Sequence, residues 1–223
     1  MIRARIVFDL DGTLIDSAPD IQGIANDLLL AEGAAPIDLT QTHEFIGNGL
    51  GVFVTRMRRL RGLPDDAHTQ LVEAFTEKYY TAFSRTKLYP GVREALQILA
   101  QDHLLGICTN KPIGPCHAVL KHLEIDSVFS TFWGGDSLPT RKPDPAMLYA
   151  AFDALGSGRQ IYVGDSEVDA QTARRASVPF LLFTEGYRKT PVDQIPHDVA
   201  FRDYHAFPDL IRHYLDAEHR DRV

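Results

Sequence analysis

The sequence predicts an α/β fold: a Rossmann-like parallel sheet core, with a small helical domain inserted after the first strand. Three observations carry this prediction. Short apolar runs alternate with helical patterns along most of the 223 residues, which is typical of βαβ units. Between about residues 16 and 88, only helical patterns occur. Turns at Ser17-Ala18-Pro19 and Tyr89-Pro90-Gly91 bound that interval and provide plausible hinges.

The first apolar run, Ala4–Phe8, contains the β-branched residues Ile6 and Val7 and predicts a strand that is buried on both faces. Similar runs predict the other strands, at Leu104–Cys108, Val128–Trp133, Gln160–Val163 and Phe180–Phe183, with a weaker pattern at Val199–Phe201. Helices of the core are expected at Val92–Ala100, Cys116–Leu123 and Pro145–Leu155. Such sheets bind ligands at the carboxyl ends of their strands.

The inserted segment has helical patterns at Asp20–Glu32, Leu50–Arg61 and Asp65–Ser84. We therefore assign residues 16–89 to the helical domain, and residues 1–15 and 90–223 to the α/β core. At helical spacing, the arginines of the insert favour a solvated face over contact with a substrate carboxylate. They are Arg56, Arg58, Arg59 and Arg61. The charged C-terminal segment from Asp216 onward is expected to fray.

Composition narrows the function further. The net charge of −7 disfavours a nucleic-acid-binding surface, which depends on Lys and Arg. Two cysteines, Cys108 and Cys116, are too few for a disulfide framework and suit a reducing compartment. The apolar stretch at the N-terminus is too short for a signal peptide, and no run is long enough to span a bilayer. We expect a soluble cytoplasmic protein.

The segment Asp9-Leu10-Asp11-Gly12-Thr13 follows the first predicted strand. Its spacing places both carboxylates on the same side of an extended chain. Two such carboxylates repel each other unless a cation neutralises them or one of them holds a proton. An ordinary Asp-Gly turn is the alternative, but a pair of aspartates between a strand and an insert favours catalysis.

A second acidic cluster follows the predicted strand at Gln160–Val163. Asp165 lies at the carboxyl end of that strand, and Asp169 lies one helical turn further on, where it can face the same site. A helix N-cap would explain Asp165 taken alone. Carboxylates from two strand ends are the oxygen ligands that a Mg²⁺ site requires.

Two further segments supply groups that could bind an anion. Thr109-Asn110-Lys111-Pro112 follows a strand, where backbone N–H groups are available to an oxyanion. Lys142 lies just before a helix, where the helix dipole favours anions over cations. A polar turn and a solvated lysine are the alternatives for the separate segments. A parallel sheet would bring all four clusters to one edge.

With these motifs in this order, the chain resembles the haloacid dehalogenase-like hydrolase superfamily over nearly its whole length. The helical insert matches the small cap domain of that superfamily. Within it, the chain is similar to the phosphoglycolate phosphatase family. That closer similarity rests on Ile46-Gly47-Asn48-Gly49, Thr109-Asn110-Lys111-Pro112 and Lys142-Pro143-Asp144-Pro145.

The resemblance implies a role for each motif residue. Asp9 would be the nucleophile that becomes an aspartyl-phosphate, and Asp11 the general acid and base. Thr109 and Lys142 would join them in catalysis and hold the phosphate. Other expected substrate contacts are Leu10, Asn110, Gly47 and Asn48. The expected Mg²⁺ ligands are Asp9, Asp165, the backbone carbonyl of Asp11, and Asp169, which would bind directly or orient the other ligands.

The implied function is Mg²⁺-dependent hydrolysis of a small phosphorylated metabolite, with 2-phosphoglycolate as the first candidate. Three alternatives stay open: a sugar phosphomutase similar to β-phosphoglucomutase, a pyrophosphatase of the same fold, and a non-catalytic phosphate-binding regulator. We expect a small phosphate ester as partner, with no nucleic acid and no membrane, and a monomer or homodimer.

Overall fold

The structure, a computed structural model, describes residues 4–220, with side chains as far as residue 217. The first three residues of the predicted core and the last three of the predicted frayed tail lie outside this range. The centre of the molecule is a six-stranded sheet whose paired strands are all parallel. The strand order is β5 (Thr131–Trp133), β4 (His103–Cys108), β1 (Ala4–Phe8), β6 (Arg159–Gly164), β7 (Phe180–Phe183) and β8 (Val199–Phe201). The predicted α/β fold class is confirmed.

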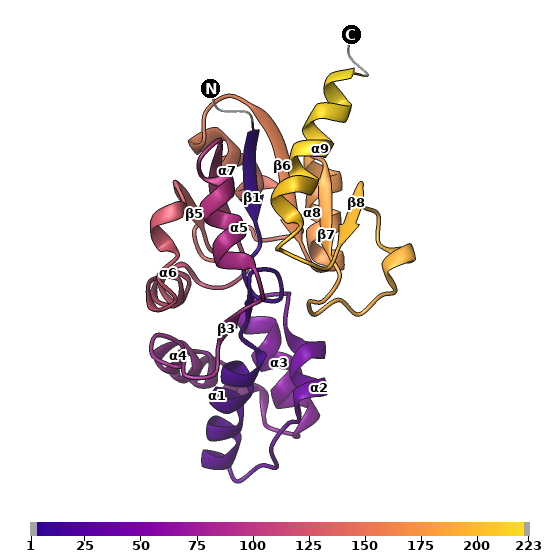
Figure 1. Ribbon diagram of the computed structural model, residues 1–223. Coiled ribbons are helices and arrows are strands. Elements are labelled where there is room, and N and C mark those ends of the chain that lie inside the picture. Colours follow the sequence, from indigo (N-terminus) through magenta and orange to yellow (C-terminus); the bar gives the residue numbers. More distant parts are fainter. Residues whose placement is uncertain (1–3, 221–223) are drawn as a thin grey trace.

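Helices cover both faces of the sheet (Figure 1). In β1, Ile6 and Phe8 belong to one apolar cluster and Val7 to another, because successive side chains of a strand point to opposite faces. The first cluster includes α5 (Val92–Leu99), α6 (Ile113–His122) and α9 (Phe207–Arg220). The second includes α7 (Ala146–Ala154) and α8 (Glu167–Ala176). The core thus has a layer of helices on each side of the sheet, and β1 lies near its middle.

The segment between β1 and α5 forms a separate group of helices at the lower end of the view in Figure 1. They are α1 (Ala18–Ala31), α2 (Leu39–Phe45), α3 (Leu50–Leu60) and α4 (His68–Tyr79), the last preceded by a 3₁₀ turn at Asp65–Ala67. These helices bury an apolar cluster of their own, which includes Phe53, Met57 and Phe75. We propose that this bundle, the cap, and the sheet with its helices are two domains, with the boundaries expected from the sequence.

The two segments that join the cap to the sheet pair with each other. β2 (Ile15–Asp16) and β3 (Lys87–Leu88) form a two-stranded antiparallel ribbon, although the sequence indicates no strand in this interval. Asp20, at the start of α1, accepts hydrogen bonds from the backbone of Arg85 and Thr86. The entry and exit of the cap are therefore tied together.

Several elements differ from the sequence-based expectations. The helix α2 was not expected, the last cap helix ends at Tyr79 instead of Ser84, and β5 begins at Thr131 because a 3₁₀ turn occupies Asp126–Val128. The C-terminal segment is helical as far as Arg220, and the expected fraying from Asp216 stays a prediction. Among residues 4–220, no helix combines the length and apolarity that a membrane span needs.

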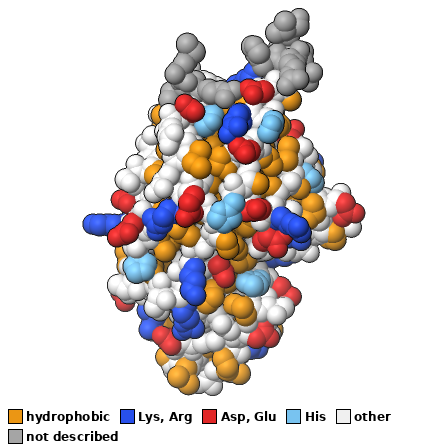
Figure 2. Space-filling view, viewed as in Figure 1, with side chains coloured by type: hydrophobic (Ala, Val, Ile, Leu, Met, Phe, Trp, Pro, Cys, Tyr) orange, Lys and Arg blue, Asp and Glu red, His pale blue; other side chains and the backbone are white. Residues whose placement is uncertain are grey.

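The cap arginines form the expected solvated face only in part, because Arg59 is exposed whereas Arg58 is not. Arg58 is buried and pairs with Asp65, while Arg56 and Arg61 donate hydrogen bonds to backbone carbonyls of the cap. Burial of the Arg58 side chain is compatible with its charge because the guanidinium has both a carboxylate and a carbonyl as partners. Figure 2 shows acidic, basic and histidine side chains interspersed over one face of the molecule.

Candidate active site

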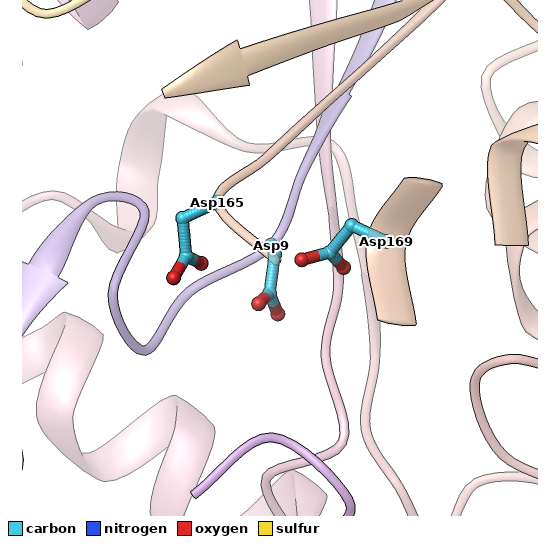
Figure 3. A group of neighbouring side chains, drawn as sticks. All are labelled: Asp9, Asp165 and Asp169. Carbon is cyan, nitrogen blue, oxygen red and sulfur yellow. The ribbon is translucent and has the colours of Figure 1, made fainter. Parts of the chain in front are cut away.

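Asp9 is placed by the sheet itself. It follows β1 directly, and its backbone N–H donates to the carbonyl of Val163 at 2.9 Å, which continues the pairing with β6. The residue is 8% exposed. Figure 3 shows its carboxylate with those of Asp165 and Asp169 on either side, one from the end of β6 and one from the first turn of α8.

Lys142 connects two of these carboxylates. Its Nζ lies 2.8 Å from Oδ1 of Asp9 and 2.7 Å from Oδ1 of Asp169. The contact with Asp9 is an ion pair at hydrogen-bonding distance. The lysine side chain is almost fully buried, so its charge depends on these two partners.

Asp169 is the more completely satisfied of these two partners. The hydroxyl of Tyr162 donates to its Oδ1 at 2.7 Å, and that of Ser166 donates to its Oδ2 at 2.6 Å. Ser166 and Asp169 also form a capping box at the start of α8. The N-cap is therefore Ser166, and the alternative interpretation of Asp165 as N-cap is wrong.

Asp165 is held from the opposite side. The hydroxyl of Thr13 donates to its Oδ1 at 2.7 Å, and the backbone N–H of Tyr187 donates to its Oδ2 at 2.6 Å. Gly12 makes this approach possible. It has a φ of +87°, and a Cβ at this position would lie 2.5 Å from Oδ2 of Asp165.

The three carboxylates could hold a metal ion. One oxygen from each of Asp9, Asp165 and Asp169 lies within 4.8 Å of the others. Burial raises the pKa of Asp9, the ammonium of Lys142 lowers it, and the charge of Asp169 raises it further. Together they bring the pKa of Asp9 to about 7. Burial and the neighbouring carboxylates raise the pKa of Asp165 well above its usual range. Asp165 has no ion-pair partner among the described residues, and Asp9 shares the single ammonium of Lys142 with Asp169, so a divalent cation would supply positive charge to this cluster.

Asp169 has the opposite electrostatic balance. Burial by itself would raise its pKa, but the charge of Lys142 and the hydrogen bonds from Lys142, Ser166 and Tyr162 bring the pKa below its usual value. This carboxylate is stabilised as an anion by protein groups alone. The donor set that most needs a cation is the pair Asp9 and Asp165.

Asp11 lies apart from the acidic cluster. Its Oδ1 accepts a hydrogen bond from the hydroxyl of Ser17 at 2.5 Å, and Nζ of Lys111 lies 3.2 Å and 3.4 Å from its two oxygens. The carboxylate thus faces the junction of sheet and cap. The expected part of its backbone carbonyl in metal binding stays a prediction.

A cavity of about 50 Å³ lies between the sheet edge and the cap. From the sheet side it is lined by Asp9, Asp11, Thr109, Asn110, Lys111 and Lys142. From the cap it is lined by residues that include Ile21, Leu50, Phe53, Phe75 and Tyr79. One wall is therefore charged and the other mainly apolar.

The other expected substrate contacts are only partly brought to this cavity. Thr109 and Asn110 line it, and the Asn110 amide donates to the carbonyls of Gly47 at 2.9 Å and Lys142 at 3.0 Å. Gly47 also lines the cavity, whereas Asn48 is not among the lining residues and accepts a hydrogen bond from Arg56 instead. Leu10 is fully buried.

Sequence reasoning gave no role to several groups that complete the site. They are Thr13, Lys111, Tyr162, Ser166 and Tyr187. Lys111 was visible as part of a motif, and Thr13 as part of another, but the partners of both side chains come from distant parts of the chain. A pattern within one segment cannot reveal those partners.

The comparison with known families now decides the relationship. The family model described as haloacid dehalogenase-like hydrolase matches residues 6–183. The chain belongs to this family. Members that act as phosphatases generally use a metal ion, and the buried acidic cluster accords with that property.

Individual proteins of this family match the chain over most of its length. A phosphoglycolate phosphatase of Cereibacter sphaeroides (strain ATCC 17029 / ATH 2.4.9) is 45% identical over 214 residues, which cover 94% of this chain and 98% of the relative. One from Rhodospirillum rubrum is 36% identical, with 92% and 90% covered. The crystal structure of a predicted phosphoglycolate phosphatase from Haemophilus somnus matches with a TM-score of 0.88 at 31% identity, covering 94% and 98%. The chain is a phosphoric monoester hydrolase, and the resemblance seen in its sequence is confirmed.

Proposed function

We propose that this phosphatase hydrolyses 2-phosphoglycolate through an aspartyl-phosphate on Asp9, with Mg²⁺ as cofactor. The observation that carries the proposal is the position of Asp9. Its carboxylate lies at the end of β1, lines the cavity together with Thr109 and Lys142, and is two residues from a second carboxylate, Asp11. This arrangement supports a nucleophile next to a separate proton carrier.

In the first step, a carboxylate oxygen of Asp9 attacks phosphorus as the bond from phosphorus to the ester oxygen breaks. Protonated Asp11 gives its proton to the departing alkoxide, which leaves as an alcohol. The Thr109 hydroxyl and the Lys142 ammonium stabilise the oxygens of the transferring phosphoryl group. Lys142 also offsets the negative charge of Asp9, which otherwise repels a phosphate dianion.

In the second step, Asp11 accepts a proton from a water molecule as that water attacks phosphorus. The acyl-phosphate bond breaks, inorganic phosphate leaves, and Asp9 is regenerated. The apolar residues of the cap wall offer water no hydrogen-bond partners on that side of the cavity. Ser17 keeps the Asp11 carboxylate near the junction of sheet and cap through both proton transfers.

Asp9 and Asp165 are the residues that would hold Mg²⁺, and Asp169 would position Lys142 beside them. When bound, the ion neutralises the carboxylates and polarises the phosphoryl group. The fit rests on the donor set, because oxygens of three buried carboxylates, those of Asp9, Asp165 and Asp169, lie within 4.8 Å of one another.

The choice of 2-phosphoglycolate is supported by the relatives, which carry the name phosphoglycolate phosphatase at up to 45% identity. Cytoplasmic location and assembly as a monomer or homodimer stay predictions from the sequence.

The deciding experiment is a substrate panel with the purified protein, scored by released phosphate. We expect turnover of 2-phosphoglycolate with Mg²⁺ and loss of at least about 100-fold in excess chelator, reversed by added Mg²⁺. Glucose 1-phosphate and pyrophosphate test the mutase and pyrophosphatase alternatives. Isomerisation of the sugar phosphate without phosphate release would overturn the hydrolase assignment, and full activity in chelator would overturn the metal requirement.

The intermediate needs a direct readout. In the Asp11→Asn variant we expect slow hydrolysis of the acyl phosphate, so that rapid quenching followed by mass spectrometry finds a phosphoryl group on the peptide containing Asp9. Wild-type protein quenched in the same way should show less of it. A variant that turns over at the wild-type rate and carries no phosphoryl group would contradict the assigned roles.

A further inference from the structure

Lys111 is a buried cation that the proposed steps do not use. Its side chain is 2% exposed, and its Nζ faces the cavity beside the two oxygens of Asp11. The ammonium also lies 3.7 Å from the centre of the Tyr79 ring, a separation at which a cation is attracted to the ring face. A carboxylate of the sheet side and an aromatic ring of the cap therefore hold this cation between them.

The cavity has two lysines among its lining residues, and they differ in what surrounds them. Lys142 is shared by two buried carboxylates, Asp9 and Asp169. Lys111 has one carboxylate partner in the described part of the chain, Asp11, and that partner has a second donor in Ser17. Asp11 thus stays held if the ammonium of Lys111 turns toward a ligand.

The cap does not supply a cation of its own to this cavity. Its arginines are not among the lining residues, and the cap residues that line the cavity are apolar or aromatic residues and glycines. A negatively charged group on the leaving part of a substrate would lose part of its hydration on entering this space. It would need a protein cation, and Lys111 is the one placed between Asp11 and the cap wall.

We propose that Lys111 is the specificity-determining residue that binds the carboxylate of the leaving group. This inference rests on the proposed function, because it concerns the same ester. Asp11 must reach the ester oxygen of the substrate in order to protonate it. In 2-phosphoglycolate a single methylene carbon separates that oxygen from the carboxylate. A cation in contact with Asp11 therefore lies within reach of that carboxylate.

A different role would also account for the contact with Asp11: Lys111 could merely position that carboxylate. The two roles predict different effects on substrate choice. A positioning residue affects every ester equally, because all of them need the same proton. A carboxylate-binding residue affects only esters that carry the carboxylate.

The test compares 2-phosphoglycolate with ethyl phosphate, which has the same two-carbon leaving group without the carboxylate. In wild-type protein we expect a clear preference for 2-phosphoglycolate in kcat/KM. In the Lys111→Met variant, which keeps the length of the side chain but not its charge, we expect a loss of about 100-fold with 2-phosphoglycolate and less than about 3-fold with ethyl phosphate. The ratio of the two values does not depend on how much of the preparation is folded.

Two matched variants serve as controls. Lys111→Arg keeps the charge and should retain most of the preference. Lys78→Met removes a lysine that pairs with Asp27 on the cap surface and should leave both values unchanged.

The outcomes separate the two proposals. If Lys111→Met loses the same factor in kcat/KM with both esters, so that its preference is unchanged, the role of Lys111 alone is overturned. A wild-type protein that hydrolyses both esters without preferring the carboxylated one would overturn the proposed substrate and the role of Lys111 together.

Discussion

The two walls of the active-site cavity contrast in chemistry and in origin. The sheet wall carries acids and lysines that follow strand ends, whereas the cap wall carries Ile21, Phe53 and Phe75 from three helices. The polar wall lies where parallel strands end, since backbone donors and charged side chains converge there. The apolar wall is part of the hydrophobic cluster of the cap. Under the proposed function, the sheet edge would perform the chemistry and the cap would form the apolar boundary of the space.

Substitution of Asp9, the proposed nucleophile on the charged wall, should have the largest effect on activity. Asp9→Asn should reduce kcat by at least about 10⁴-fold, because an amide cannot form the acyl phosphate. Steady-state kinetics with 2-phosphoglycolate measures the loss, and Asp27→Asn on the cap surface is the matched control. Near wild-type turnover by Asp9→Asn would show that phosphoryl transfer does not pass through this residue.

Removing the charge of Lys142 should affect stability as well as turnover. Lys142→Met leaves Asp9 and Asp169 without their buried cation, and we expect a loss of about 3–5 kcal/mol in the free energy of unfolding. Urea denaturation without added metal measures it. Lys78→Met should change the same quantity by less than about 0.5 kcal/mol. Equal stability of the two variants would mean that the buried ion pairs contribute little.

The charged wall should also make the metal-free protein sensitive to pH. The pKa of Asp9 is raised from 3.8 to about 7, so the folded state binds more protons than the unfolded state between these values. Stability from this group is present below about pH 4 and is lost as pH rises toward 7. Asp165 shifts in the same direction, and Asp169 in the opposite one.

Urea denaturation in chelator across this pH range checks the prediction. Asp9→Asn should flatten the decline, and Mg²⁺ should counteract it by binding the ionised carboxylates. Metal-free protein that gains stability from pH 4 to pH 7, with or without this substitution, would contradict it.

The smallest effect on stability and activity is expected from substitutions in the apolar cap wall. Phe75→Leu should cost about 1 kcal/mol in stability, because the ring packs against Phe53 and Tyr79 in the cluster of the cap. By enlarging the cavity, it should improve kcat/KM for bulkier esters relative to ethyl phosphate. An unchanged selectivity would indicate that the cap wall does not limit substrate size. Ile98→Ala, at a half-exposed position outside the cavity, is the control.

Elements with a strong pattern of their own were predictable. The run Ala4–Phe8 forms the expected strand, and α3 begins at Leu50 as its apolar spacing indicates. The helix α2 was missed because it has only two turns and few apolar residues. Its one local signal was the capping box between Asp38 and Gln41. The ribbon of β2 and β3 has two residues per strand, too few to give a periodic pattern.

The site shows the same division. Asp9 and Asp165 were recognisable because each carboxylate directly follows a strongly apolar strand, and the parallel order places such strand ends together. The pairing of Lys142 with Asp169 and the hydroxyl of Tyr162 beside them depend on contacts between elements that no single segment records. Arg58 looked like a surface residue for the same reason, since its partner Asp65 lies beyond the end of its helix.

By itself, the sequence determined the α/β fold, the position of the helical insert and the set of acids at the sheet edge, because hydrophobic periodicity and strand-end motifs are local properties. The tertiary structure alone decided how the charges are distributed. It paired Lys142 with the buried carboxylates of Asp9 and Asp169, left Asp165 without such a cation among the described residues, and placed Lys111 between Asp11 and the ring of Tyr79. These outcomes depend on burial and on distances of a few ångströms, which only the packed chain defines.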